Sequence, residues 1–271
     1  MAWLWILIGV AGAVGVWLFC YCQNNLLVTT CVSMYSSKID GAVRIVHLSD
    51  LHSKEFGRNN QRLLSRVARE HPDFIAITGD IVGRYAKSFV SAVYLADKLC
   101  KLAPVYYVPG NHEYGREDRE ELFEALRRAG VCVLQHQWCE LSLQGEKLHL
   151  LGLDEMGYRH KTPQILREFS SKQGYKIVLS HFPQLCSEVY CLYDVDLVLS
   201  GHAHGGQFIF PWIGGIYAPG QGLRPKYYRG KYQLGRVALV VSRGLGNSGF
   251  PLRLFNPPDI VRIEIKSKSA R

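Results

Sequence analysis

Ser200-Gly201-His202-Ala203-His204-Gly205-Gly206-Gln207 is the stretch that decides how this chain folds and where its chemistry lies. It follows an apolar run at 195–199 that predicts a buried strand. In an extended segment the side chains at positions i and i+2 point the same way, and the flanking glycines allow a sharp turn and a close approach. Two imidazoles directed at one point indicate a metal site, although such a pair alone is also common in structural roles.

Earlier apolar runs end in polar residues in the same manner. Strands are predicted for the runs at 43–48, 73–78, 104–108 and 175–179. In order, these runs lead into Asp50 and His52, Asp80, Asn111 and His112, and His181. Open α/β sheets place their binding sites at the carboxyl ends of their strands. The sequence therefore predicts that these polar side chains meet the two histidines at one edge.

The order of these blocks resembles that of the calcineurin-like metallophosphoesterases, whose pattern is D-x-H, G-D, G-N-H-[E/D], H and G-H-x-H. The resemblance covers residues 43 to about 265. The Gly-Gly-Gln after the last block, and the tail from Ser242 to Arg253, are similar to the membrane-linked bacterial phosphodiesterase and pyrophosphatase subgroup. The resemblance implies an α/β fold in which two mixed β-sheets pack as a sandwich flanked by helices, the αββα fold.

The resemblance also implies a centre with two divalent metal ions as cofactors. It assigns one ion to Asp50, His52 and His204, the other to Asn111, His181 and His202, and the bridging position to Asp80. Oxygen and nitrogen ligands without a thiolate suit Mn, Zn or Fe and argue against calcium. Two such ions lower the pKa of a bridging water, whose hydroxide would attack the phosphorus.

His112 is the candidate catalytic residue. It directly follows Asn111, so in an extended segment its side chain should diverge from the metals and be free to protonate the leaving oxygen or to bind phosphate. Protein phosphatases of the superfamily read G-D-x-x-D-R, and here Gly83 replaces the second Asp, which would orient the histidine. Similarity to protein phosphatases is therefore weaker than to diesterases and pyrophosphatases, and His112 must be oriented in another way.

Three arginines, Arg84, Arg243 and Arg253, are candidate substrate contacts. A solvated arginine is an equally ordinary explanation for Arg84. The candidate metal ligands also have ordinary explanations when each is considered alone, as helix caps, turn residues or loop residues. The joint pattern of five blocks in the expected order favours the metal site.

Residues 2–22 form one uncharged apolar run, long enough to cross a bilayer as a helix. Aromatic residues lie near both ends, and the run lacks the basic n-region of a signal peptide. We expect a transmembrane anchor at 1–22, a polar connector at 23–41 and a metallophosphoesterase domain at 42–271. The expected location is the cell membrane, single-pass. Lys38 and Arg44 only weakly favour a cytoplasmic domain, so the side stays undetermined. The alternative for residues 2–22 is a buried core helix, which is disfavoured because such a helix would be unusually apolar on every face.

Helices are predicted between the strands, at 59–70, 87–102 and 116–129, and this alternation implies parallel strands. From residue 131 onward the pattern changes to short strands. They are predicted at 132–134, 140–143, 147–151, 236–241 and 260–265, with a turn at 144–145.

The net charge of the chain is +9, and the segment 205–258 has seven basic residues and no acidic one. Phe208, Ile209, Phe210 and Trp212 follow the last histidine block directly. This combination suits a substrate with a phosphate head and an acyl tail, or docking on anionic lipid. A hairpin packed on the core is the alternative. No nucleic-acid-binding motif is present, so no nucleic acid partner is expected. The eight cysteines contain no C-x-x-C pair, which argues against a cysteine zinc site.

These observations favour a membrane-anchored, dinuclear-metal phosphohydrolase that cleaves a phosphodiester or pyrophosphate. A lipid-linked substrate such as UDP-2,3-diacylglucosamine is one specific case. The alternatives are a phosphomonoesterase acting on proteins or small metabolites, and a scaffold that has lost its metals. The missing Asp at position 83 counts against a protein substrate, and a dead scaffold would normally lack ligands, none of which is lost here. The sequence does not predict the metal or the oligomeric state.

Overall fold

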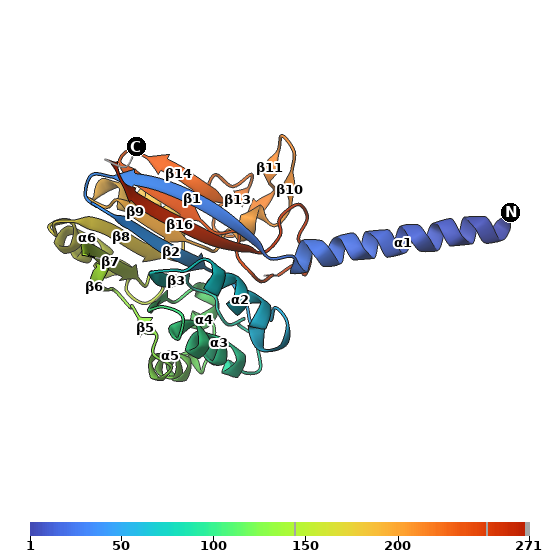
Figure 1. Ribbon diagram of the computed structural model, residues 1–271, viewed down its shortest axis with the longest axis horizontal. Helices are drawn as coiled ribbons and strands as arrows, with labels where there is room; N and C mark the ends of the chain where they lie inside the picture. The colour runs from blue at the N-terminus through green and yellow to red at the C-terminus, as the bar shows by residue number, and fades with distance from the viewer. Residues whose placement is uncertain (144, 248, 269–271) are drawn as a thin grey trace.

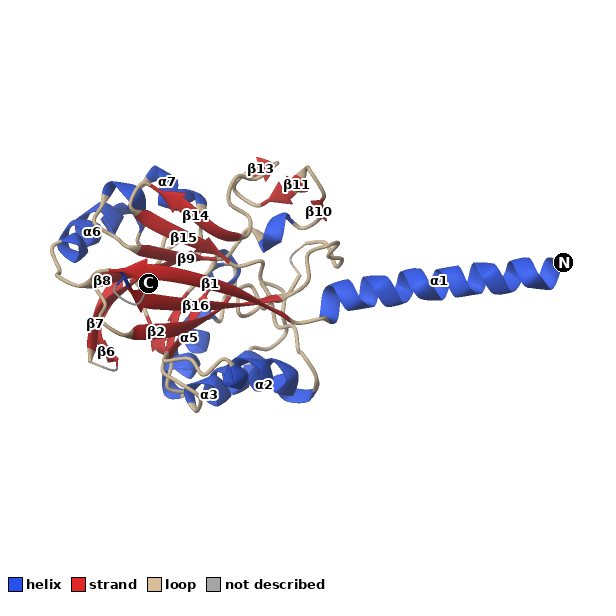
Figure 2. Ribbon diagram, turned by 45° about the horizontal axis from the view of Figure 1, so that its top comes forward, coloured by secondary structure: helices blue, strands red, loops and turns tan. Residues whose placement is uncertain are grey.

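The computed structural model describes residues 1–143, 145–247 and 249–268. Two six-stranded sheets lie face to face with helices on their outer faces, and one long helix projects from the body (Figures 1 and 2). The first sheet has the strand order β1-β16-β2-β3-β4-β5, and the second has the order β14-β15-β9-β8-β7-β6. The expected sandwich of two mixed sheets flanked by helices is therefore confirmed.

The helices are α1 (Ala2–Asn25), α2 (Gln61–Arg69), α3 (Val90–Cys100), α4 (Asn111–Tyr114), α5 (Arg119–Arg128), α6 (Thr162–Ser170) and α7 (Gln184–Glu188). The first sheet contains β1 (Val28–Ser36), β2 (Ala42–Leu48), β3 (Phe74–Thr78), β4 (Val105–Val108), β5 (Cys132–Val133) and β16 (Asp259–Ser267). The second contains β6 (Gln137–Leu143), β7 (Glu146–Leu153), β8 (Tyr175–Ser180), β9 (Leu197–Ser200), β14 (Gly230–Leu234) and β15 (Val237–Val241). Two small hairpins lie outside both sheets, β10 (Ile209–Phe210) with β11 (Gly214–Gly215) and β12 (Tyr217–Ala218) with β13 (Gly222–Leu223).

Neighbouring strands from β2 to β5 are parallel, as the alternation of strands and helices predicts. In the second sheet β7, β8, β9 and β15 are parallel, and the antiparallel strands β6 and β14 form its edges. Central strands such as β3 and β15 are buried at every residue, because both of their faces are covered. Because both faces are covered, the sequences of these strands are continuous apolar runs and not alternating patterns.

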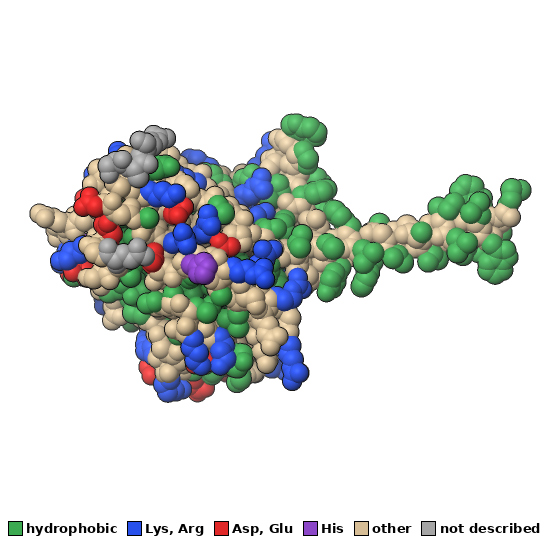
Figure 3. Space-filling model, in the orientation of Figure 1, with side chains coloured by type: hydrophobic (Ala, Val, Ile, Leu, Met, Phe, Trp, Pro, Cys, Tyr) green, Lys and Arg blue, Asp and Glu red, His purple; other side chains and the backbone are tan. Residues whose placement is uncertain are grey.

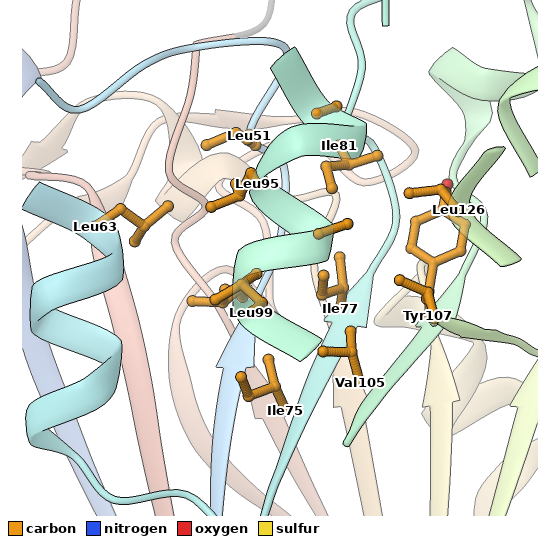
Figure 4. Close-up of a cluster of buried hydrophobic side chains, with 14 of the residues drawn as sticks. Leu51, Leu63, Ile75, Ile77, Ile81, Leu95, Leu99, Val105, Tyr107 and Leu126 are labelled. Atoms are coloured by element: carbon orange, nitrogen blue, oxygen red, sulfur yellow. The ribbon is translucent and has the colours of Figure 1, made fainter. Parts of the chain in front are cut away.

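Three apolar layers hold the molecule together. One lies between the first sheet and its helices, where Leu95 and Leu99 of α3 gather against Ile75, Ile77 and Val105 (Figure 4). A second lies between the two sheets, and a third lies between the second sheet and helices α6 and α7. Full burial of one leucine or isoleucine contributes about 1.5–3 kcal/mol. These layers therefore fix the strand ends that carry the site.

The predicted helices at 59–70, 87–102 and 116–129 correspond to α2, α3 and α5, each somewhat shorter than expected. Strand β14 is missing from the sequence-based prediction because exposed and partly buried residues alternate along it, so it forms no apolar run. The turn predicted at 144–145 includes Gln144, which lies outside the described residues.

Residues 23–41 differ from the polar connector that the sequence suggests. Helix α1 continues to Asn25, and Val28–Ser36 forms β1, which pairs with β16 along its whole length. Val32 and Met34 of β1 are buried in the layer between the sheets. The physical reason is that only one face of this edge strand is covered, which leaves its sequence as polar as a linker. Only Leu26 and Leu27 separate α1 from the folded domain.

The last turn of α1 and the predicted site lie at the same end of the sandwich. Strand β1 starts directly after α1, runs parallel to β16, and β16 runs antiparallel to β2. On β16, Asp259 pairs with Val28, while Val261 pairs with His47 near the carboxyl end of β2. The carboxyl ends of β2, β3 and β4 therefore face the side from which α1 projects (Figure 1).

Candidate metal centre

The seven predicted metal ligands come together at the carboxyl ends of the strands. Asp50 and His52 follow β2, Asp80 follows β3, Asn111 begins α4 after β4, His181 follows β8, and His202 and His204 follow β9. All of them are buried except His52 and Asn111, which are partly buried. Their side chains form two groups, and Asp80 belongs to the second group while facing His52 of the first.

The first group consists of Asp50, His52 and His204, whose ligand atoms lie within 4.8 Å of one another. The Nε2 atoms of His52 and His204 are 3.2 Å apart, and His204 Nε2 is 3.5 Å from Asp50 Oδ1. Burial lowers the pKa of His52 to about 4 and that of His204 well below its usual range. Both imidazoles are therefore neutral near pH 7, the form in which histidine binds a metal.

The second group consists of Asp80, His181 and His202, with Asn111 beside them. His181 Nε2 lies 3.3 Å from Asp80 Oδ2, 3.1 Å from His202 Nδ1 and 3.1 Å from Asn111 Oδ1. The Nδ1 atom of His181 faces the carbonyl oxygen of Thr78 at 2.8 Å, which leaves Nε2 directed at the group.

His181 and Asp80 form a charge pair. Burial opposes ionisation of both, but the attraction and hydrogen bond of Asp80, together with the charge of Asp50 and the Thr78 carbonyl, outweigh it and raise the pKa of His181 to about 9. Burial likewise acts to raise the pKa of Asp80, but the attraction and hydrogen bond of His181, together with His52 and His112, outweigh that effect and hold the pKa well below its usual range. Metal binding by His181 therefore requires loss of its proton.

Asp80 has the geometry expected of a bridging carboxylate. Its Oδ1 accepts a hydrogen bond from the backbone N–H of His112 at 2.8 Å. Its Oδ2 is buried and has no hydrogen-bond partner within the described part of the chain, yet it faces His52 at 3.8 Å and His181 at 3.3 Å. A buried carboxylate oxygen without a donor is costly. The mixture of donors around this oxygen fits two divalent cations, one held by each group.

The backbone of the candidate ligands is strained. Asp50, His52, Asp80, His202 and His204 have φ values of 52°, 49°, 53°, 64° and 46°. Such left-handed conformations cost of order 1–3 kcal/mol for residues other than glycine and cluster at functional sites. Here a strand ends and the chain must turn at once, which directs each side chain into the site rather than along the sheet. The spacing of His202 and His204 suggests an extended segment, in which residues i and i+2 point the same way. Because both residues have a left-handed backbone instead, that argument does not describe their geometry.

Glu113 maintains this strained arrangement, although the sequence analysis assigns it no role. Its buried carboxylate accepts hydrogen bonds from the backbone N–H groups of Asp80 and Gly110 at 2.9 Å and of Val82 at 3.1 Å. It thereby ties the loop after β3 to the loop after β4. In the sequence, this role of Glu113 is indicated by its position as the acidic residue that ends the Gly-Asn-His-Glu block.

Two glycines are required by close contacts. A Cβ atom on Gly110 would lie 2.2 Å from Asp80 Oδ1, and a Cβ atom on Gly201 would lie 2.4 Å from Asp50 Oδ2. Any side chain at either position would displace a candidate ligand.

The backbone at His112 has a different conformation from the expected one, although the side chain remains accessible. Residues 111–114 form the short helix α4 rather than an extended segment, and His112 does not diverge from the group. Its Nε2 lies 4.0 Å from Asp80 Oδ2, and its ring centroid is 4.4 Å from that of His52. Its Nδ1 accepts a hydrogen bond from the backbone N–H of Arg84 at 3.2 Å. This contact orients the His112 ring, a task for which Gly83 has no side chain. The sequence does not predict the contact, because every residue type except proline has a backbone N–H.

The three predicted substrate arginines have different environments. Arg84 is exposed beside the site, where its Nη2 donates to the carbonyl oxygen of Asn111 at 3.2 Å. Arg253 is fully buried and donates to the carbonyl oxygens of Arg243, Gly246 and Asn256. Arg243 is paired with Asp259 at 3.2 Å. The expectation that Arg243 and Arg253 contact substrate is therefore corrected, because their donors are used inside the protein.

Arg253 and Asn256 support the site from behind. The loop that Arg253 holds donates from Gly246 N–H to the carbonyl oxygen of Asp50 at 2.6 Å. Asn256 is buried and donates through Nδ2 to the carbonyl oxygen of His204 at 2.7 Å. A residue's burial cannot be read from this irregular tail, so the sequence gives no indication of either role.

Comparisons with known proteins agree with this geometry. Residues 43–206 match the family described as calcineurin-like phosphoesterase. An uncharacterized metallophosphoesterase of Aquifex aeolicus (strain VF5) is 34% identical over 241 residues, which cover 83% of this chain and 86% of the relative. A Danio rerio protein named transmembrane protein with metallophosphoesterase domain is 29% identical over 242 residues, which cover 83% of this chain and 53% of that protein.

The fold has a solved counterpart in a dimetal phosphatase from Danio rerio. It matches with a TM-score of 0.50 at 14% identity, over 76% of this chain and 88% of that one. The family match covers most of the sandwich, and the bacterial relative spans nearly the same length as this chain. The chain therefore belongs to the calcineurin-like phosphoesterases, hydrolases of phosphate esters that use a dinuclear divalent metal centre.

Proposed function

We propose that this protein is a membrane-anchored phosphohydrolase that cleaves a phosphodiester or pyrophosphate at the surface of the bilayer. A lipid-linked substrate such as UDP-2,3-diacylglucosamine fits this description. The observation that carries the proposal is the position of the candidate metal centre at the end of the sandwich from which α1 projects (Figure 1).

Helix α1 has the properties of a membrane span. Its 24 residues include no charged side chain, none of them is buried, and its length and composition suffice to cross a bilayer. The zebrafish relative is named as a transmembrane protein. In water, such an exposed apolar helix would be unfavourable, because none of its apolar surface is removed from the solvent.

The end of α1 is connected to the site through two loops. Asn247 Nδ2 donates to Asn24 Oδ1 at 2.9 Å, and the neighbouring Gly246 donates to the carbonyl oxygen of Asp50. Lys54, two residues beyond His52, hydrogen-bonds to the carbonyl oxygen of Asn24. These contacts support a fixed position of the site relative to the anchor.

The aromatic segment after His204 adds a second apolar contact on this side. Phe255 contacts Phe19 of α1, with ring centroids 5.8 Å apart, and Phe210 of β10, with centroids 6.5 Å apart. Ile209 is buried, whereas Trp212 at the tip of the β10–β11 hairpin is wholly exposed. The base of the hairpin is thus packed, as the core alternative expects, and its tip remains available for lipid.

The residues of the site divide the chemistry between them. The two groups around Asp80 hold the divalent cations, which when bound lower the pKa of water and neutralise charge on the phosphoryl oxygens. Because His112 Nδ1 accepts a hydrogen bond from Arg84, the proton of the neutral ring is assigned to Nε2, which faces Asp80. Burial lowers the pKa of His112 and so favours this neutral form. In this neutral form Nε2–H can donate a hydrogen bond to a phosphoryl oxygen, and His112 protonates a leaving oxygen when it carries the second proton of the imidazolium.

The test is a hydrolysis panel with the full chain in phospholipid nanodiscs and Mn, Zn or Mg. Diesters and pyrophosphates linked to lipid should be cleaved faster than soluble monoesters, and Asp80→Asn should abolish both activities. A preference for soluble monoesters would favour the phosphomonoesterase alternative. Absence of turnover on every substrate, together with absence of bound metal, would favour the scaffold.

A further inference from the structure

We propose that the cavity between α2 and the end of α1 binds the phosphate of an anionic phospholipid headgroup. The cavity has a volume of about 390 Å³ and lies outside the candidate metal centre. The inference rests on the proposed function in one respect, because it requires that α1 spans the bilayer. It assigns a second phosphate site, which holds a structural lipid and not the substrate.

The lining of the cavity has the chemistry of a headgroup site. Helix α2 contributes the guanidinium groups of Arg62, Arg66 and Arg69, the amide of Gln61 and the hydroxyl of Ser65. Arg62 and Arg66 are four residues apart, as are Gln61 and Ser65, so each pair lies on one side of the helix. Leu26, which is 54% exposed, completes the cavity at the α1 end. Residues with charged and neutral donors thus line the cavity beside an apolar contact, which matches a phosphate joined to acyl chains.

The positive charge of this helix is not neutralised by the protein. Helix α2 contains no acidic residue, and among the described residues none of its arginines is in an ion pair. Glu70, which follows α2, faces Arg262 at 3.5 Å instead. Some exposed arginines elsewhere have acidic partners, such as Arg119 with Glu120 and Arg127 with Glu124, whereas others, such as Arg128 and Arg224, are in no ion pair among the described residues. What distinguishes α2 is that three arginines without an acidic partner in the described part of the chain line a single cavity.

The depth of the cavity matches the headgroup layer. A helix of 24 residues is about 36 Å long, whereas the hydrocarbon core of a bilayer is about 30 Å thick. The last residues of α1 therefore reach the headgroups. At this level Arg62 Nη2 donates to the carbonyl oxygen of Asn25 at 3.4 Å, and Arg66 Nη2 to that of Leu27 at 3.2 Å. Figure 3 shows basic side chains gathered below the point where α1 leaves the body.

A bound headgroup would fix how the domain sits on the membrane. A single helix leaves rotation about its own axis free, whereas a second contact beside it holds one face of the domain against the lipid. Arginine is suited to this task because it keeps its positive charge beside the phosphate and the lipid.

The experiment uses the full chain in vesicles of phosphatidylcholine that contain a minority of phosphatidylglycerol with a photoreactive headgroup. After irradiation, labelled peptides are identified by mass spectrometry. We expect labelling of residues 26–27 or 61–69, with competition by unlabelled phosphatidylglycerol and not by phosphatidylcholine. Arg62→Gln with Arg66→Gln should lower the labelling by roughly twenty-five-fold, about fivefold for each arginine.

Two further variants make the result specific. Arg127→Gln with Arg128→Gln, an equal loss of charge in the last turn of α5, should leave labelling unchanged. Arg62→Lys with Arg66→Lys should retain most of it, because the charge is kept. An equal loss in this lysine variant would show that the substitutions had displaced α1 and would overturn the lipid site.

Other outcomes also contradict the proposal. Equal labelling by a photoreactive phosphatidylcholine would show a site without selectivity for anionic lipid. Competition by soluble glycerol phosphate would show a site for free phosphate instead of lipid. If the chain resists alkaline carbonate extraction and α2 is unlabelled, only the lipid site is overturned. If carbonate releases the chain, the anchor of the proposed function is overturned, and the lipid site with it.

Discussion

Asp80 is the residue on which both groups of candidate ligands depend. Its unpartnered Oδ2 lies between His52 and His181, so Asp80→Asn removes one negative charge from both positions. We expect weaker binding of both metals and a loss of turnover of several orders of magnitude. Metal content measured by mass spectrometry, together with the rate on a soluble diester, checks this. Asp97→Asn, at an exposed carboxylate paired with Lys101, is the matched control. Normal metal content in the Asp80 variant would contradict the dinuclear arrangement.

His112 should affect the reaction without affecting the metals. We expect His112→Ala to keep its metal content and to lose roughly 10²–10⁴ in rate, because a positioned proton donor contributes about that much. The loss should shrink for a nitrophenolate leaving group, which needs no proton. Rates on activated and unactivated substrates are compared, with the exposed His160→Ala as control. Equal losses on both substrates would make His112 a phosphate-binding residue.

Side-chain ligands could be predicted from the sequence, and the groups that orient them could not. Five blocks with the right residue types lead to seven side chains that lie together in the structure. The hydrogen bond from Arg84 N–H to His112, by contrast, uses a backbone group that has no sequence signature. Arg253 was misassigned for a related reason. An arginine near a phosphate site resembles a ligand until its burial among carbonyl oxygens is known.

At the scale of elements, apolar runs predict strands well where both faces are covered. All five strands that carry the blocks, including β3 and β9, are of this kind. The prediction fails at edges: β1 and β14 each leave a face open and therefore lack a continuous apolar run. It also fails at α4, a helix of four residues that is too short for helical periodicity to appear.

The β10–β11 hairpin should distinguish lipid-borne from soluble substrates. Trp212 and Arg224 are exposed, and neither contacts a candidate metal ligand. We expect Trp212→Ala combined with Arg224→Ala to lower activity on lipid-linked substrates in membranes and to leave a small soluble diester nearly unaffected. The reason is that tryptophan partitions to lipid interfaces, and a nearby arginine adds about 1 kcal/mol on an anionic surface.

The control for the hairpin is a similar pair at the opposite end of the sandwich. Leu192 and Arg236 are also exposed, next to the amino ends of β9 and β15. Leu192→Ala with Arg236→Ala should change neither activity. Parallel losses on both substrates in the hairpin variant, with a lower melting temperature, would show that the hairpin is part of the core.

At the scale of the whole molecule, metal binding should stabilise the fold, because its ligands come from both sheets. Free metal at about a hundred times its Kd stabilises a protein by about 2.7 kcal/mol, which is roughly 5–10 °C in a domain of this size. We expect chelation to lower the melting temperature by this amount, as measured by calorimetry. Asp80→Asn, which should bind metal more weakly, should show a smaller change on chelation. A chelator-independent wild-type protein would show that the two sheets are not joined by metal.

The common position of the anchor and the candidate metal centre has a kinetic consequence. Only Leu26 and Leu27 separate α1 from β1, so the proposed membrane anchor and lipid-borne substrate would bring enzyme and substrate together within one plane. Encounter in a plane is governed by the number of substrate molecules per unit area and not by their number per unit volume. Adding inert lipid at constant total substrate should therefore slow the reaction in proportion to surface dilution. The rate on a water-soluble diester in the same vesicles should stay constant.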